Sequence, residues 1–319
     1  MTQQQITRII HTRTAGDLLT IISLSLVGVA GWFKPATAET SAWLPDFWGL
    51  GVALFLSLAI AALLRLINKE FNILRADTAL PSALVLALFS ALPPVSTSFY
   101  PGLLLAAVVT GISLILFTTF GRPRGGRRRV FLMFTILSGL GTLSTCFLYY
   151  IPLLLIGCIQ MRTFSLKTLL AAILGVLTPP WILIGSGLLS LESFRLPSFE
   201  IPALEADNPF SLTLLAVTAI TIITGLMFLG ANMIKVYAYN SKGRAMNGFY
   251  SILLLGSVLL TIIDFNNLIL YVPLIMTMTA YQASHFFAQH QYPLSWIGIA
   301  VFLLACWGAD IWYTLFLPL

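Results

Sequence analysis

Apolar residues come along this chain in long blocks separated by short polar or charged stretches. A block of about 18 or more residues with few charges is typical of a membrane span, because about 20 helical residues cross about 30 Å of hydrocarbon. We therefore predict an all-α fold, a polytopic transmembrane helix bundle that forms a single domain over residues 1–319. About eleven spans are expected, at residues 18–33, 47–64, 80–96, 102–120, 130–144, 147–161, 168–190, 211–232, 249–263, 267–283 and 294–311.

Polar clusters divide two of the long apolar runs into pairs of spans. The uncharged run 130–161 is too long for one ordinary span, and Gly139 and Gly141, which polar residues follow, predict a break. The result is either two short spans or a partly re-entrant hairpin. The polar residues 264–267 divide the run 249–283 in the same way, and we expect this turn at the outer surface.

The composition also indicates a membrane protein. Of the 319 residues, 58% are hydrophobic and 9% are charged, against about 45–50% and about 25% in soluble domains. The net charge of +6 follows from topology, because short cytoplasmic loops retain Lys and Arg. With a cytoplasmic N-terminus, every Lys and Arg except Lys34 and Arg195 lies inside, and the C-terminus lies outside. We predict a bacterial inner (cytoplasmic) membrane protein that does not bind nucleic acid.

The first span raises a question of processing. A basic leader precedes it, and Ala36-Thr37-Ala38 follows it, as in a cleaved secretory signal. We favour an uncleaved first span, because the leader is long and Lys34 and Pro35 crowd the cleavage site.

Arginines at the predicted inner surface are the first candidates for a binding site. A basic side chain beside a membrane attracts anionic lipid headgroups by about 1 kcal/mol per charge, and guanidinium groups bind phosphate in a bidentate manner. The candidates for binding a lipid phosphate are Arg75, Arg122, Arg124, Arg127, Arg128, Arg129 and Arg162. The alternative is that these loops collect arginines for topology alone. Membrane lipids, among them a polyprenyl or lipid phosphate, are the expected partners.

Carboxylates on the predicted outer face are the second candidates. A carboxylate at the mouth of a helical bundle can act as a general base or hold a divalent metal. The candidate catalytic residues are Asp46, Asp264 and Asp310, and the alternative for each is a structural or solvated role. The three cysteines and three histidines lack the spacing of metal ligands, so we expect no metal and no cofactor. His285 and His290 are interpreted as interfacial residues.

A transporter driven by protons or sodium usually needs ionisable groups at membrane depth. None falls near the centre of a predicted span, which disfavours this function. Pro179-Pro180, followed by Gly185-Ser186-Gly187, is the best candidate for a broken helix that binds an ion or substrate. The alternative is a simple proline kink.

Several short motifs lie between residues 60 and 185. They are Leu66-Ile67-Asn68-Lys69-Glu70-Phe71-Asn72-Ile73-Leu74-Arg75, Leu80-Pro81, Leu148-Tyr149-Tyr150-Ile151-Pro152, Arg162-Thr163-Phe164-Ser165-Leu166-Lys167, Gly175 and Pro179-Pro180. Through these motifs the chain resembles a family of uncharacterised multi-pass membrane proteins from Bacteroidota. The family carries no established activity. The resemblance implies an arginine-lined pocket at the inner membrane surface, suited to a phosphate headgroup, or else residues that fix the packing of helix ends.

Three functions follow from these patterns. The first is an enzyme of envelope glycan or lipid assembly that acts on a lipid-linked, phosphate-bearing intermediate. The second is a non-catalytic scaffold subunit of an envelope machine. The third is a transporter or flippase. The sequence does not decide whether the protein is an enzyme.

Overall fold

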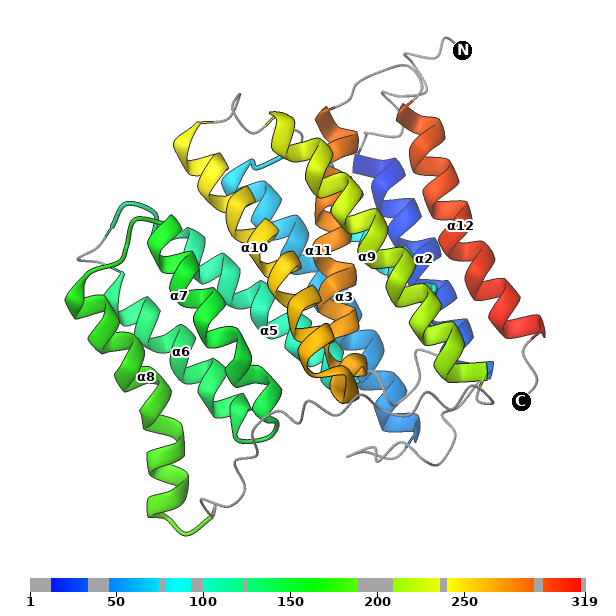
Figure 1. Cartoon of the computed structure of the whole chain (residues 1–319). Coiled ribbons are helices and arrows are strands. Elements are labelled where there is room, and N and C mark those ends of the chain that lie inside the picture. Colours follow the sequence, from blue (N-terminus) through cyan, green and yellow to red (C-terminus); the bar gives the residue numbers. More distant parts are fainter. Residues whose placement is uncertain are drawn as a thin grey trace. The chain divides into compact units, whose positions relative to one another are not determined.

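Helices form the whole of the described structure. The structure, a computed structural model, describes residues 13–33, 46–74, 78–92, 100–122, 126–188, 209–235, 240–289 and 295–316. Within these ranges it contains eleven α-helices and two short 3-10 helices, and no strand (Figure 1). They are α2 (Arg13–Phe33), α3 (Asp46–Phe71), α4 (Leu80–Ser90), α5 (Tyr100–Phe117), α6 (Arg127–Gly141), η1 (Thr145–Tyr150), α7 (Ile151–Gln160), α8 (Leu166–Gly185), α9 (Pro209–Lys235), α10 (Ser241–Ile263), η4 (Phe265–Asn267), α11 (Leu268–Gln289) and α12 (Ser295–Phe316).

The prediction of an all-α membrane protein is confirmed, but the count of eleven spans is wrong. Among the described residues, five helices are long and apolar enough to cross a membrane, namely α3, α5, α8, α9 and α10. The chain is therefore an integral, multi-pass membrane protein. Helix α4 has 11 residues and α6 has 15, which at about 1.5 Å per residue is shorter than the hydrocarbon layer. Counting apolar runs in the sequence thus gave too many spans.

The helices group into two compact units. Unit 1 holds α2, α3, α4, the first part of α5, α9, α11 and α12, and unit 2 holds the rest of α5 together with α6, η1, α7, α8 and α10. The prediction of a single domain over residues 1–319 concerns independent folding and stays a prediction.

Unit 1 is built around two helices that protein surrounds. Every residue of α4 is buried, and so is every residue of α11 from Tyr271 to His285. A helix buried on all sides is packed by other helices rather than by lipid. Glycines permit two of the close approaches, because a Cβ at Gly16 would lie 2.6 Å from Ala79 Cβ and one at Gly102 would lie 2.6 Å from Ile269 O. Small residues serve helix packing in membranes in this way.

Unit 2 contains a helical hairpin, as predicted. Helix α6 ends at Gly141, the chain turns, and η1 leads into α7. Gly141 packs directly on Leu148 at the turn, and at the other end of α7 a Cβ at Gly157 would lie 2.9 Å from Leu116 of α5. The predicted break after Gly139 is thus confirmed, and α7 runs back toward the end of unit 2 where α6 begins.

Helix α8 runs parallel to α6 and packs closely against it. A Cβ at Gly175 would lie 2.7 Å from Phe131 O, and the Ser138 hydroxyl donates to Val176 O at 2.6 Å. These contacts advance in the same direction along both helices, so the two N-termini lie at one end of unit 2. Helix α8 continues through Pro179 and Pro180 without interruption, and the predicted broken helix is not found.

The start of α10 and the turn after it follow local sequence signals. Asn240 caps the helix, because its Oδ1 accepts from Gly243 N at 2.8 Å. The helix ends before Asp264, and η4 then turns the chain into α11. The predicted division of the run 249–283 is therefore confirmed.

Candidate functional site

Basic side chains from several helix ends meet at one end of unit 2. Helix α6 begins there with Arg127, Arg128 and Arg129, and Arg122 lies in the turn that follows α5. The turn between α7 and α8 and the start of α10 add further basic residues at the same end. We call this set the cationic end; it consists of Arg122, Arg127, Arg128, Arg129, Arg162, Lys167, Lys242 and Arg244.

Hydrogen bonds hold the turns of the cationic end together. Gly121 N donates to Met161 O at 3.0 Å, which joins the turn after α5 to the turn after α7. Arg129 uses one guanidinium NH to donate to Thr118 O at 3.0 Å, and so closes the end of α5. Arg129 therefore has a structural role that the exposed Arg128 does not share.

The first turns of α10 lie beside the last turn of α7. A Cβ at Gly248 would lie 3.2 Å from Gln160 Nε2, and a Cβ at Gly157 would lie 2.5 Å from the Phe249 ring. Lys242 and Arg244 precede Gly248 and Phe249 on α10. The packing of α10 on α7 therefore places these two basic residues at the same end of unit 2 as the arginines of the other turns.

Arg162 has an unusual backbone conformation. Its φ is +55°, in the left-handed region, where α7 ends. Its N–H donates to Ile159 O at 3.0 Å, and Thr163 N donates to Cys158 O at 3.1 Å. Glycine usually occupies this position after a helix. Strained residues other than glycine cluster at functional sites in proteins.

The charge of the cationic end is not balanced locally. Among the described residues of unit 2 the one carboxylate is Asp264, at the far end of α10. The 23 residues of α10 make a helix about 35 Å long, far beyond the screening length of about 8 Å at physiological salt. Helices α6, α8 and α10 also begin at the cationic end, and their dipoles add positive potential there. The arrangement attracts anions.

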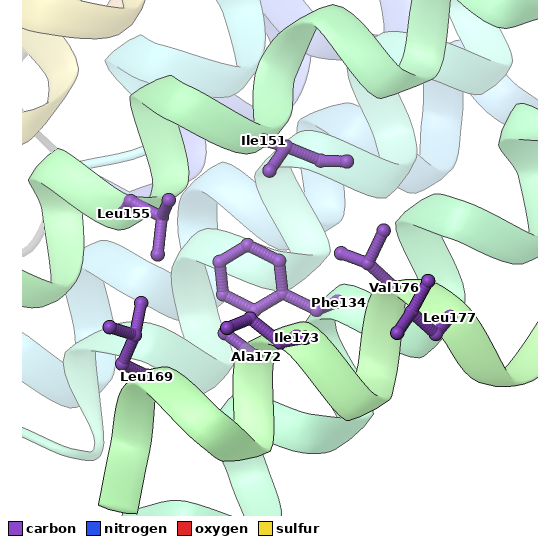
Figure 2. Close-up of a pocket in the computed structure, with 8 residues that line it drawn as sticks. All are labelled: Phe134, Ile151, Leu155, Leu169, Ala172, Ile173, Val176 and Leu177. Carbon is purple, nitrogen blue, oxygen red and sulfur yellow. The ribbon is translucent and has the colours of Figure 1, made fainter. Parts of the chain in front are cut away.

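An apolar groove adjoins the cationic end between α6, α7 and α8 (Figure 2). Its volume is about 210 Å³. The groove is lined by Phe134 of α6, by Ile151 and Leu155 of α7, and by five residues of α8 from Leu169 to Leu177, all apolar. Figure 2 shows the Phe134 ring between the α7 and α8 side chains.

Several buried polar atoms near the cationic end lack a hydrogen-bond partner within the described part of the chain. They are Arg127 Nε, Gln160 Oε1 and both polar atoms of the Asn247 amide. A buried polar group without a partner costs about 1–3 kcal/mol. Groups of this kind are therefore suited to meet a polar ligand or water.

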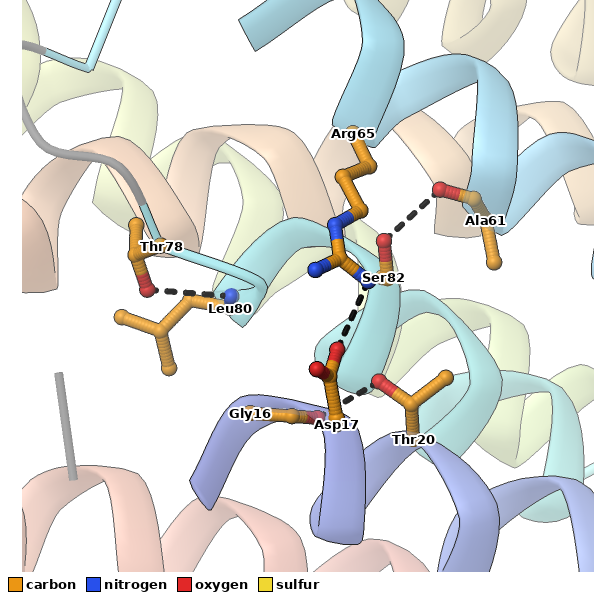
Figure 3. Close-up of polar contacts among 8 residues, drawn as sticks. All are labelled: Gly16, Asp17, Thr20, Ala61, Arg65, Thr78, Leu80 and Ser82. Carbon is orange, nitrogen blue, oxygen red and sulfur yellow. Dashed lines mark hydrogen bonds and ion pairs between the residues drawn. The ribbon is translucent and has the colours of Figure 1, made fainter. Parts of the chain in front are cut away.

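Basic residues of unit 1 are arranged differently. Arg65 of α3 forms an ion pair with Asp17 of α2, with 2.6 Å between the guanidinium nitrogen and the carboxylate oxygen (Figure 3). Beside this pair the Ser82 hydroxyl donates to Ala61 O at 2.7 Å, which ties α4 to α3. Because a carboxylate neutralises Arg65, we assign this contact to helix packing.

The predicted phosphate-binding residues separate into two groups. The structure brings Arg122, Arg127, Arg128, Arg129 and Arg162 together at the cationic end. Arg75 and Arg124 lie outside the described residues.

The predicted catalytic carboxylates are not brought together by the described residues. Asp46 begins α3 and Asp310 lies on α12, with side chains outside the described part. Asp264 is 1% exposed; both of its oxygens accept from Asn267 Nδ2, at 2.9 and 3.0 Å, and the Cys146 thiol lies 3.8 Å from Oδ2. The contacts with Asn267 lie within the turn, and the contact with Cys146 joins the turn to η1. A catalytic role for Asp264 stays a prediction.

Sequence reasoning assigned no role to three basic residues of the cationic end, Lys167, Lys242 and Arg244. The sequence did indicate that all three lie on the same side of the membrane, because they fall in the first turns of helices that start at the predicted inner face. No group of three or more His, Cys, Asp or Glu suited to a metal occurs among the described residues.

Protein encloses His285, and its interpretation as an interfacial residue stays a prediction. His285 lies on α11 with no exposed surface, and its ring lies 6.2 Å from that of Tyr281. One turn back, Gln282 Oε1 and Gln282 O accept from Asn232 Nδ2 of α9, both at 2.8 Å. The apolar pattern ended the span at residue 283, whereas helix α11 continues to Gln289 and packing encloses its polar side chains. His290 lies outside the described residues.

Comparisons with protein-family models, with curated proteins and with solved structures find no match to this chain. The resemblance to a Bacteroidota family stays a prediction.

Proposed function

We propose that this multi-pass membrane protein binds a phosphate-bearing lipid at the cationic end of unit 2, in the service of envelope glycan or lipid assembly. The observation that carries the proposal is the meeting of eight basic residues from separate helix ends, with Asp264 at the far end of α10 as the one carboxylate among the described residues of this unit. Each charge near a lipid surface contributes about 1 kcal/mol toward an anionic headgroup.

The proposal includes an orientation. The N-terminus and the cationic end face the cytoplasm, and the C-terminus and the turn at Asp264 face the outside of a bacterial inner membrane. The placement of basic residues at one end of α10 and of Asp264 at the other supports this orientation, because basic residues are retained inside.

Single-cysteine labelling tests the orientation. The native cysteines Cys146, Cys158 and Cys306 are all buried. We expect N266C, at an exposed position of the turn after α10, to react with a membrane-impermeant maleimide in intact spheroplasts. R128C should react only after lysis. The reverse result would place the cationic end outside and contradict the proposal.

Lipid binding is tested by native mass spectrometry of the full-length protein in neutral detergent. Phosphatidic acid should be retained and phosphatidylcholine should not. The double variant R128A/R162G should lose most of this retention, whereas K69A, which removes a charge from the exposed end of α3 in unit 1, should keep it. Equal retention by all of these proteins would contradict the proposal.

A specific observation favours transport as a second candidate function. Polar side chains of α11, among them Thr277, Gln282 and His285, are fully buried in unit 1, and Asn232 Oδ1 lacks a partner among the described residues. Buried polar and ionisable groups within a membrane bundle often mark a pathway. If H285A abolishes a transport activity while lipid retention is unchanged, the site of function lies in unit 1.

A further inference from the structure

The groove beside the cationic end has room for one hydrocarbon chain. A dry cavity of about 150 Å³ holds one benzene molecule, so the groove volume of about 210 Å³ corresponds to about eight carbons at the same density. Its lining on α8 extends from Leu169 to Leu177, a rise of about 12 Å. About eight carbons of one extended chain fit this length, the rest of a longer chain such as farnesyl extends past the groove into the lipid, and two chains side by side exceed the volume.

The groove begins near the level of the charges along the helix axes. Leu169 follows Lys167 by two residues on α8, a rise of about 3 Å, although side chains two residues apart point to different helix faces. Phe134 follows Arg127 by seven residues on α6, and residues seven apart share one helix face. Arg127 Nε is a buried donor with no acceptor in the described part of the chain. Along α8 this spacing leaves little length for a linker between a chain in the groove and a phosphate at the cationic end, whereas along α6 the separation is about 10 Å.

The groove is open to lipid on the side of α8. Ile173 and Leu177 line it and are 45% and 57% exposed. The neighbouring Leu170, Leu174 and Trp181 are exposed as well. An apolar helix face with this exposure lies against hydrocarbon in a membrane protein. A lipid chain therefore enters from the bilayer without crossing water.

We propose that the ligand is a prenyl phosphate, one hydrocarbon chain joined directly to a phosphate monoester. This inference rests on the proposed function and names its ligand. A phosphate monoester carries about −1.5 to −2 charges near neutral pH, which suits an uncompensated cluster of eight basic residues better than the single charge of a diester. Phosphatidic acid has the same headgroup but two chains, and lysophosphatidic acid has one chain but a glycerol linker.

The groove and the cationic end contribute differently to binding. Lipid tails are as apolar as leucine, so moving a chain from the bilayer into the groove yields little driving force. The cationic end supplies the attraction. The groove then selects among lipid phosphates by the number of chains and by the linker.

Native mass spectrometry of the full-length protein in neutral detergent tests this inference with farnesyl phosphate, lysophosphatidic acid and dioleoyl phosphatidic acid. Farnesyl phosphate should bind about tenfold more tightly than either of the others. I173W and A172F place larger side chains at the groove and should weaken farnesyl phosphate binding about fivefold while changing phosphatidic acid binding less than about twofold. Because Ala172 is buried, I173W at the exposed edge serves if A172F does not fold.

L170F is the matched control, since Leu170 is 51% exposed on α8 and does not line the groove. It should bind all three lipids as the native protein does. If I173W behaves like L170F, or if lysophosphatidic or phosphatidic acid binds as tightly as farnesyl phosphate, the inference is wrong. The proposed function survives those results provided that R128A/R162G weakens every lipid phosphate; if that variant weakens none, the proposed function fails as well.

Discussion

Arg162 allows charge and stability to be separated in one variant. Its backbone is left-handed, with φ +55°, a conformation that costs residues other than glycine about 1–2 kcal/mol. Glycine removes this strain but loses about 0.5–1 kcal/mol through its greater freedom in the unfolded chain. R162G should therefore raise the free energy of unfolding by up to about 1.5 kcal/mol. Removal of one charge should weaken phosphatidic acid binding by about 1 kcal/mol, which is about fivefold in Kd.

Unfolding by SDS in mixed micelles measures the first effect, and native mass spectrometry measures the second. R162K keeps both the charge and the strained backbone, so it should match the native protein in stability and lose less affinity for phosphatidic acid than R162G does. N72G is a backbone control. Asn72 also has positive φ, +47°, at the end of α3, but asparagine tolerates that region, so glycine relieves little strain there. A less stable R162G, or one that binds phosphatidic acid with unchanged affinity, would refute the reasoning.

Three further variants test the packing of the two units. G175A places a Cβ 2.7 Å from Phe131 O and should lower the free energy of unfolding in SDS by about 1–3 kcal/mol, whereas a Cβ at Gly139 meets nothing closer than 3.9 Å and G139A should be tolerated. N232L removes both hydrogen bonds to Gln282 and should cost about 0.6–1.7 kcal/mol. D264N replaces one of the two oxygens that accept from Asn267 Nδ2 by an amide NH2 and removes the charge, which should cost about 1.5–3 kcal/mol; the double variant D264N/N267D should recover most of the loss.

The boundaries between helices were readable from the sequence where polar residues interrupt an apolar run. Residues 264–267 and the residues after Gly141 both end helices, as predicted. The backbone turns there, and local hydrogen bonds close each turn: Thr142 Oγ1 donates to Gly139 O at 2.6 Å, and Asn267 N donates to Asp264 O at 3.2 Å. The number of spans was not readable in this way. A run such as 80–96 is apolar enough for a span, but α4 has 11 residues. An apolar pattern is the same for a helix that protein covers and for a helix that lipid covers, so the sequence did not distinguish the two.

The candidate site was predictable in part. The arginines were predicted to lie at one membrane face because each follows or precedes an apolar run at its cytoplasmic end. The addition of Lys242 and Arg244 to the same cluster depends on α10 packing beside α7, through Gly248 and Gly157. That contact joins residues far apart in sequence. The groove depends likewise on the parallel packing of α6 and α8, which no local pattern encodes.

Salt separates the two contributions to lipid recognition that the structure distinguishes. Attraction at the cationic end acts through solvent, and the screening length falls from about 10 Å at 0.1 M salt to about 3 Å at 1 M. Raising the salt concentration should therefore weaken farnesyl phosphate and phosphatidic acid together, because both carry a phosphate monoester. The groove selects by shape, which salt does not screen, so the ratio of the two dissociation constants should stay constant across the titration. If the ratio falls toward one as the salt rises, the preference is electrostatic and the apolar groove of unit 2 does not select the chain.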